Sequence, residues 1–290
     1  MPDLQEQLSQ YRTWIEKYLK TCYRYDKEPQ QRLFEAARYS LLAGGKRLRP
    51  IFVFDFCRMA GGDWKKATPF AAAVEMIHTY SLIHDDLPCM DNDDYRRGKP
   101  TNHKVFGEAM AVLAGDALLT DAFAMAVTQP LPEGKLSLAI GVLSECAGSL
   151  GMVGGQALDI DSETRTCTEQ EVLNIQTRKT GSLINAACVL GVIAGGGGEE
   201  QIQAACSFAA NLGLAFQIRD DILDCIGDAN TLGKTVGTDT KKNTFVRLYG
   251  MEACESMVLR HTELATSALQ AFDSPEMMQA LAKSLVDRVF

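Results

Sequence analysis

The chain has 290 residues, of which 46% are hydrophobic, so it can bury a sizeable core in one large domain or in two smaller ones. Its formal net charge of -8 argues against a nucleic acid as the main partner, although a local group of basic residues could still bind an anion. Apolar neighbours around Cys57, Cys188 and Cys206, and the lack of any C-x-x-C pair, are typical of buried, reduced thiols in an intracellular protein.

The amino-terminal stretch Met1–Gln7 is polar and acidic, unlike a signal peptide. No uninterrupted apolar run approaches the roughly 20 residues that span a bilayer. We therefore expect a cytoplasmic protein without a transmembrane segment.

The first half of the chain shows the apolar spacing of helices. Leu8, Tyr11 and Ile15 recur at intervals of three and four residues. A later alanine-rich segment is apolar on most sides, which indicates a buried helix, and Pro88 lies just beyond its last turn. The spacing predicts helices over 4–23, 31–42, 50–60, 69–87 and 107–127, with a polar loop to about residue 104 before the last of them.

The second half continues in the same way, and Thr168 begins a helix with Glu171 in the capping-box position. Alternating β patterns, Asn-Gly hairpins, fixed-period repeats and interdomain linkers are not found in the sequence. The sequence therefore predicts one all-α domain over residues 1–290. The expected elements are helices over 135–158, from 168 onward, over 199–226, 245–271 and 274–289, a turn at 195–198 and a long loop over 227–243.

One acidic cluster lies on the helix predicted over 199–226. Asp220 and Asp224 are one helical turn apart, and Gln217, Asp221 and Asp224 follow i, i+4, i+7 spacing, so these side chains project from one side. Like charges this close repel one another, and a bridging divalent cation such as Mg²⁺, which prefers oxygen ligands, removes that cost. A solvated acidic surface is the alternative, but the apolar residues between 212 and 223 would bury most of this helix.

A second acidic cluster begins in the last turn of the helix predicted over 69–87. Asp85 and Asp86 lie at the carboxyl end of the helix dipole, where negative charge is unfavourable without a compensating cation. Asp91 lies beyond Pro88, in a loop that can turn back to complete the coordination. The His84-Asp85 pair also resembles metal phosphohydrolases, but four histidines in total leave few candidates for their other ligands.

Basic residues occur in separate groups beside glycines or in predicted loops, where backbone amides can also approach an anion. Arginine makes fork-like contacts with phosphate oxygens, and lysine supplies a point charge. Each group alone would be typical of a solvated surface, and the first lacks the spacing of a phosphate loop. The groups are Gly44–Pro50, Arg96–Pro100, Arg178–Gly181, Gly233-Lys234 and Lys241-Lys242.

Together these motifs resemble the trans-isoprenyl diphosphate synthases, or polyprenyl synthetase family. The resemblance rests on D-D-x4-D-x4-R-R-G from Asp85, D-D-x2-D from Asp220 and G-G-K-R-L-R-P from Gly44. Gly154–Asp159 and Lys179-Thr180 also match, and the order is right from about residue 30 to about residue 250. The resemblance implies a bundle of antiparallel helices around a deep central cavity, usually in a homodimer.

The resemblance also implies roles for individual residues. About three Mg²⁺ ions, replaceable by Mn²⁺, would grip an allylic diphosphate. Their ligands would be Asp85, Asp91 and Asp220, supported by Asp86, Asp221 and Asp224. The same diphosphate would be held by Arg96, Lys179 and Lys234, with help from Lys242. The diphosphate of isopentenyl diphosphate would be held by Gly45, Lys46, Arg49, His78 and Arg97, and the developing carbocation would be stabilised by oxygens of Thr180 and Gln217.

The implied reaction is the head-to-tail (1'-4) condensation of isopentenyl diphosphate with dimethylallyl and then geranyl diphosphate. Cations neutralise the leaving diphosphate, so the allylic C–O bond ionises and the C4 double bond of isopentenyl diphosphate attacks the cation. The released diphosphate would remove the C2 proton. Water would quench the cation, so the loop predicted over 227–243 would serve as a lid.

The chain length of the product would depend on Tyr80 and Ser81. Five residues of helix separate Tyr80 from Asp85, about 7.5 Å, so the bulky ring could form a floor, although it could also be an ordinary core aromatic. Tyr80 and the two extra residues between Asp85 and Asp91 resemble bacterial-type farnesyl diphosphate synthases. Plant-type geranylgeranyl synthases share the insertion but have a smaller floor residue. We therefore expect (2E,6E)-farnesyl diphosphate, a C15 product, with C20 as the alternative.

Two positions depart from the family pattern: Phe245-Val246 stands where Tyr-Pro is common, and Asp287–Phe290 lacks the usual terminal lysine that would help to close the site. Two other classes of function are alternatives. A terpene cyclase would share the acidic clusters but would not need a second diphosphate pocket with Lys46, Arg49 and Arg97. A catalytically silent partner subunit would have lost carboxylates that are intact here.

Overall fold

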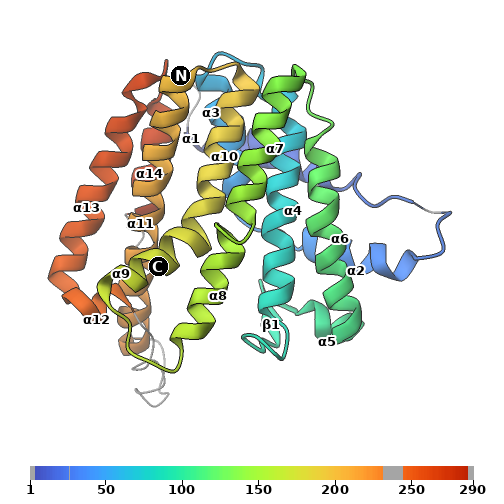
Figure 1. The fold of residues 1–290 in the computed structure, drawn as a ribbon, viewed down its shortest axis with the longest axis horizontal. Coiled ribbons are helices and arrows are strands. Elements are labelled where there is room, and N and C mark those ends of the chain that lie inside the picture. The colour runs from blue at the N-terminus through green and yellow to red at the C-terminus, as the bar shows by residue number, and fades with distance from the viewer. Residues whose placement is uncertain (1–3, 26, 231–243, 287–290) are drawn as a thin grey trace.

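The computed structural model describes residues 4–25, 27–230 and 244–286, and within them the predicted all-α class is confirmed. Most helices run side by side along one direction, with α13 at the left of the view and α6 toward the right (Figure 1). The helices are α1 (Leu4–Leu19), α2 (Gln31–Leu41), α3 (Leu48–Met59), α4 (Thr68–Asp85), α5 (Asn102–Phe106), α6 (Glu108–Ala126), α7 (Glu133–Ala147), α8 (Met152–Ser162), α9 (Glu169–Gln176), α10 (Ser182–Gly195), α11 (Glu199–Asn230), α12 (Phe245–Tyr249), α13 (Met251–Ala268) and α14 (Glu276–Val286), with short turns η1 (Trp64–Ala67), η2 (Thr177–Gly181) and η3 (Leu269–Ala271).

Three helices, α3, α4 and α10, form the interior of the bundle. Phe52, Phe54 and Phe56 of α3 are all buried, although alternate residues of a helix point to opposite sides, so α3 is surrounded by protein. α10 packs against α3, and α4 packs against α6. Burial raises the pKa of the Cys57 thiol to about 12, which keeps this core cysteine protonated.

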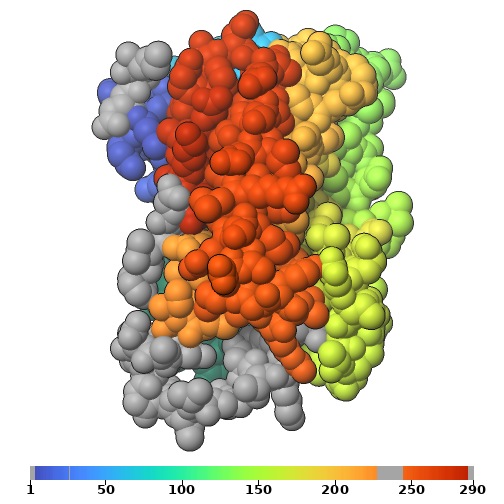
Figure 2. All heavy atoms as spheres, turned by 90° about the vertical axis from the view of Figure 1, so that its left-hand side faces the viewer, coloured from blue at the N-terminus to red at the C-terminus, as the bar shows by residue number. Residues whose placement is uncertain are grey.

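A second hydrophobic cluster joins the end of the long helix α11 to α9, α12 and α13. It contains Ile218 and Ile222 of α11, Val172 of α9, Phe245 of α12 and Val258 of α13. In the view of Figure 2, α13 forms the middle of the surface and lies over α11. The apolar side of α11 therefore faces α13, and this orientation decides where the acidic residues of α11 can point. The predicted capping box of Thr168 and Glu171 at the start of α9 is confirmed.

The prediction of one helix over 135–158 was wrong. The chain leaves the helical path at Gly148 and resumes at Met152, so α7 and α8 are separate helices. A Cβ atom at Gly151 would overlap the carbonyl oxygen of Cys146, so this change of direction requires glycine. The break matters for function because it lets α8 approach the η2 turn.

Other boundaries also differ from the predictions. The loop expected before residue 104 contains the strands β1 (Tyr95–Arg96) and β2 (Lys99–Pro100), which pair antiparallel, and the short helix α5. Arg97 and Gly98 between the strands both have positive φ, as in a two-residue hairpin turn. α11 extends to Asn230, four residues into the predicted loop, and Gly250 divides the helix expected over 245–271.

Two stretches of the described chain are long and apolar enough, by length and composition alone, to cross a membrane. α6 and the stretch Glu133–Ser162 pass that test of length and composition, and only 33% of each window is buried. The second stretch is interrupted at residues 148–151, so it is not one continuous helix. Two such helices are weak evidence of a membrane span, and the outward apolar faces of α6 and α7 equally fit a contact with another protein.

Candidate functional site

A cavity of about 440 Å³ lies between α4 and α8, and it is named the main cavity because several predicted site residues line it. Residues of α4 line one wall, residues of α8 line the facing wall, and the η2 turn closes one side. Its lining residues are Arg49, His78, Tyr80, Ser81, Leu82, His84, Asp85, Met90, Met152, Val153, Gln156, Ala157, Ile160, Lys179 and Thr180. The predicted site residues Arg49, His78, Tyr80, Ser81, Asp85, Lys179 and Thr180 therefore meet at one cavity.

Two lining residues have the properties of an anion site. Nε of Arg49 is buried and has no hydrogen-bond partner within the described part of the chain. Burial lowers the pKa of Arg49 to about 10, and nearby Arg97 acts in the same direction. A bound anion would therefore stabilise the charged form of this guanidinium. Burial and the neighbouring arginines also lower the pKa of His78 well below 6.5. His78 is therefore neutral at pH 7 and can donate one N–H.

The loop before α3 is held by Arg47, whose importance the sequence did not reveal. Its guanidinium is buried and contacts Glu16 of α1 at 2.7 Å, Glu75 of α4 at 2.5 Å and the carbonyl oxygen of Leu41 at 2.8 Å. Arg47 has φ +52°, so its backbone turns sharply between Lys46 and Arg49. These contacts tie the basic loop to three helices.

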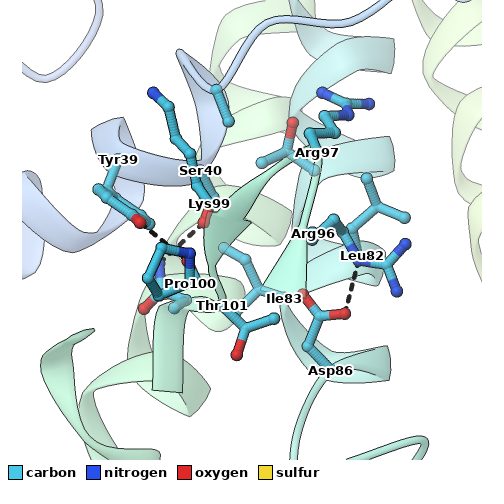
Figure 3. Close-up of a pocket in the computed structure, with 13 residues that line it drawn as sticks. Tyr39, Ser40, Leu82, Ile83, Asp86, Arg96, Arg97, Lys99, Pro100 and Thr101 are labelled. Atoms are coloured by element: carbon cyan, nitrogen blue, oxygen red, sulfur yellow. Dashed lines mark hydrogen bonds and ion pairs between the residues drawn. The ribbon is translucent and has the colours of Figure 1, made fainter. Parts of the chain in front are cut away.

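Two further predicted diphosphate ligands lie on the hairpin, outside the main cavity. Arg97 donates to the carbonyl oxygen of Gly44, and its guanidinium covers Gly45 so closely that a Cβ there would lie 2.8 Å from Cζ. Nε of Arg96 lies 2.5 Å from Oδ1 of Asp86 (Figure 3). Figure 3 also shows Arg97 pointing away from this pair. Lys46 is exposed.

The first acidic cluster lies at the carboxyl end of α4. Asp85 faces the cavity, and burial together with Asp91 and Asp86 raises its pKa to about 6, although Lys179 and Arg96 oppose the shift. The backbone N–H of Asp91 donates to the carbonyl oxygen of Asp85 at 2.9 Å, so the loop turns back on the helix end. A bound cation would stabilise the ionised form of Asp85. Mg²⁺, which prefers oxygen ligands, fits this site.

The second acidic cluster lies on α11. Asp220 and Asp221 are half-buried and Asp224 is exposed, while Gln217 is half-buried one turn earlier. Oδ2 of Asp221 accepts a hydrogen bond of 2.7 Å from the backbone N–H of Phe245, so Asp221 also anchors the start of α12. Lys234, Lys242, most of the predicted lid 227–243 and Asp287–Phe290 lie outside the described residues.

No three Asp, Glu, His or Cys side chains gather closely enough to hold a metal ion within residues 4–25, 27–230 and 244–286. Mg²⁺ is usually held by one or two carboxylates together with substrate phosphates. The distribution of the aspartates between the end of α4 and the carboxyl-terminal third of α11 is therefore compatible with ions shared with a bound diphosphate. The metal-ligand roles of the six aspartates stay predictions.

Lys179 lies in the π-helical turn η2, a kind of bulge that often occurs at functional sites. Its Nζ lies 2.6 Å from Oδ2 of Asp159 on α8. A Cβ atom at Gly155 would overlap the backbone nitrogen of Lys179, so glycine lets α8 approach the turn this closely. The sequence motif Gly154–Asp159 drew attention to this segment but did not show that Asp159 pairs with Lys179.

Comparisons with known proteins agree with this geometry. Residues 30–284 match the family model for polyprenyl synthetase. The chain is 47% identical to a farnesyl diphosphate synthase of Micrococcus luteus over 98% of this chain and 99% of that protein, and 44% identical to one of Geobacillus stearothermophilus over 93% and 91%. It is 48% identical to geranylgeranyl pyrophosphate synthase 7, chloroplastic, of Arabidopsis thaliana over 87% and 74%. The solved FPP/GFPP synthase of Zymomonas mobilis superimposes with a TM-score of 0.88 at 36% identity, over 98% of this chain and 99% of that chain.

Proposed function

The chain belongs to the polyprenyl synthetase family, and we propose that it is a farnesyl diphosphate synthase working as one domain over residues 1–290. It condenses isopentenyl diphosphate head to tail with dimethylallyl and then geranyl diphosphate, and it releases (2E,6E)-farnesyl diphosphate and diphosphate. One observation carries this proposal: a single cavity joins Arg49, whose buried Nε has no hydrogen-bond partner within the described residues, to a wall containing the bulky ring of Tyr80. Identities of 47% and 44% over nearly the full length of two farnesyl diphosphate synthases support it.

The cofactor is Mg²⁺, about three ions per site, and Mn²⁺ substitutes for it. When bound at this site, Mg²⁺ would supply positive charge that neutralises the diphosphate leaving group and so would favour ionisation of the allylic C–O bond. The raised pKa of Asp85 supports this assignment, because a buried carboxylate near Asp91 and Asp86 has too little positive charge around it to stay ionised easily. The ligands are Asp85, Asp91 and Asp220, with Asp86, Asp221 and Asp224 in support.

Separate groups of residues bind the two substrates. Arg49 and neutral His78 bind the diphosphate of isopentenyl diphosphate from inside the cavity, and Gly45, Lys46 and Arg97 contribute from the loop and hairpin outside its lining. Lys179 and Arg96 hold the allylic diphosphate, with Lys234 and Lys242, and Lys179 exchanges its contact with Asp159 for that anion. Oxygens of Thr180 and Gln217 face the developing carbocation. Apolar side chains of α8 such as Val153 and Ile160 exclude water.

A C20 product is the second candidate. Geranylgeranyl pyrophosphate synthases of Arabidopsis thaliana are 46% and 48% identical to this chain, close to the values for the farnesyl diphosphate synthases. Overall identity therefore does not separate the two products, and the bulk of Tyr80 favours C15.

The enzyme is also proposed to be a cytoplasmic homodimer. Val112 and Leu113 of α6 and Leu138 of α7 are exposed, and both helices lie in stretches of high mean hydropathy. An apolar face of this kind fits an interface between protein chains. A second copy of the chain would cover this apolar face directly.

Diphosphate release tests the reaction class. Purified protein should release diphosphate from dimethylallyl diphosphate only when isopentenyl diphosphate and Mg²⁺ are both present. Asp85→Asn should lower kcat by about 100-fold, whereas Asp273→Asn, an exposed aspartate outside the cavity lining, should leave it unchanged. Release from geranyl diphosphate without isopentenyl diphosphate would instead indicate a cyclase, and no release from a folded sample would indicate a silent subunit.

A further inference from the structure

His84 is a cavity residue to which the proposed reaction assigns no role. It lies in the last turn of α4, one turn after Tyr80, and its side chain is 27% exposed. Its ring meets the ring of Tyr80 edge to face, with centroids 5.7 Å apart and an angle of 74°. Both rings line the main cavity.

The imidazole of His84 is anchored on α6. Nε2 lies 3.1 Å from the carbonyl oxygen of Val112 and 4.0 Å from Oδ1 of Asp116. A carbonyl oxygen can only accept, so this geometry assigns the proton to Nε2. A Cβ atom at Gly115 would overlap the imidazole, so the ring can occupy this position only because α6 has glycine there.

Tyr80 has no comparable anchor of its own. Its hydroxyl group is buried without a hydrogen-bond partner within the described residues, and its side chain is 4% exposed. Packing alone therefore holds the Tyr80 ring. The ring of His84 provides an aromatic contact of this packing next to the cavity. Removal of the imidazole would both free the Tyr80 ring and add its own volume to the cavity.

We propose that His84, seated on α6 by Gly115 and the carbonyl oxygen of Val112, positions the Tyr80 ring and so helps to set the length of the product. His84 is a positioning residue and does not touch the reacting atoms. The inference rests on the proposed function, because it presupposes a growing prenyl chain that Tyr80 stops. A purely structural histidine would affect stability but not the ratio of products.

The test compares product chain lengths in variants with measured thermal stability. His84→Ala removes the ring. His84→Gln also removes the ring but keeps an amide N–H that can reach the carbonyl oxygen of Val112, so this variant still tests the proposal if His84→Ala fails to fold. Both should raise the C20 to C15 ratio by about tenfold, the size expected for the loss of one aromatic contact. Gly115→Ala should push the imidazole toward the cavity and shift the product toward C10. His261→Ala, a half-buried histidine that contacts Asn211, is the matched control and should leave the ratio unchanged.

The outcomes separate this inference from the proposed function. Wild-type protein that makes C15, together with an unchanged ratio in both His84 variants, would overturn the role of His84 and leave the proposed function intact. A wild-type protein that makes C20 or does not condense the substrates would overturn both.

Discussion

At the scale of single residues, the basic loop between α2 and α3 owes its shape to a buried ion pair. Arg47 contacts Glu75 and Glu16 from a position between two residues proposed to bind isopentenyl diphosphate. Removal of a buried arginine leaves its carboxylate partner buried and unpaired, which lowers the free energy of unfolding by about 3–5 kcal/mol. The orientation of the neighbouring Lys46 and Arg49 should change as well.

Substitution of Arg47 should therefore act on one substrate more than on the other. Arg47→Ala should lower the free energy of unfolding by about 3–5 kcal/mol, and Arg47→Lys, which keeps the charge but not the fork, should lower it less. In Arg47→Lys the KM for isopentenyl diphosphate should rise about tenfold while the KM for the allylic substrate stays near that of the wild type. Steady-state kinetics with each substrate varied in turn provide the measurement. An equal rise of both KM values would show a general structural defect instead.

His78 should make stability depend on pH. Its pKa is lowered in the folded protein, whereas in the unfolded chain it takes up a proton near pH 6.5. The unfolded state therefore binds more protons below pH 6.5, so the contribution of neutral His78 is complete above that pH and is lost as the pH falls. Urea unfolding at pH 5 to 8 should show wild-type stability falling toward low pH relative to His78→Asn, by at most about 1.4 kcal/mol per pH unit. Parallel curves for the two proteins would contradict this.

The sequence was informative at this scale where charges are clustered along the chain. It selected Asp85 and Lys179, which the structure brings to one cavity. It missed the partners that only folding brings close, such as Asp159 beside Lys179, 20 residues apart. Glu75 offered a usable signal, because a carboxylate inside an alanine-rich buried helix needs a cation.

At the scale of elements, the contact between α8 and the η2 turn shapes the reactive side of the cavity. Gly155→Ala should force α8 away from Lys179, since the added Cβ would overlap backbone atoms that cannot rotate aside. We expect a loss of about 2 kcal/mol or more in the free energy of unfolding and a large fall in kcat.

Gly134→Ala is the control for this substitution. Gly134 lies in the first turn of α7 with open space where its Cβ would be, so alanine there should be neutral or stabilising by up to about 1 kcal/mol. Chemical denaturation and turnover of both variants measure the difference. Similar stability and activity for the two would contradict the tight contact.

The helices themselves were largely predictable, because their apolar spacing is strong and several, such as α7, α10 and α12, end at glycine. The break between α7 and α8 was not, since apolar residues continue on both sides of Gly148–Gly151 and periodicity does not register a change of direction. The β1–β2 hairpin was missed because each strand has only two residues, and its turn uses Arg97-Gly98 in place of Asn-Gly.

At the scale of the whole molecule, α6 and α7 present apolar side chains that nothing in the described chain covers. Leu113 and Leu138 are each 52% exposed. Light scattering after size-exclusion chromatography should give a homodimer, and Leu113→Lys combined with Leu138→Glu should shift it toward monomer by burying two charges in an apolar interface. Leu259→Lys, a 63% exposed leucine of α13, is the matched control and should remain dimeric. A monomeric wild-type protein at micromolar concentration would contradict the homodimer.

The most direct test of the central claim is the chain length of the product. Purified protein with Mg²⁺, dimethylallyl diphosphate and labelled isopentenyl diphosphate is analysed by chromatography of the dephosphorylated products, beside Tyr80→Ala and Tyr80→Phe. We predict C15 for the wild type and for Tyr80→Phe, which keeps the ring and removes only an unpartnered hydroxyl, and C20 or longer for Tyr80→Ala. Wild-type protein that makes C20, or Tyr80→Ala that still stops at C15, would contradict a cavity whose length is set by Tyr80.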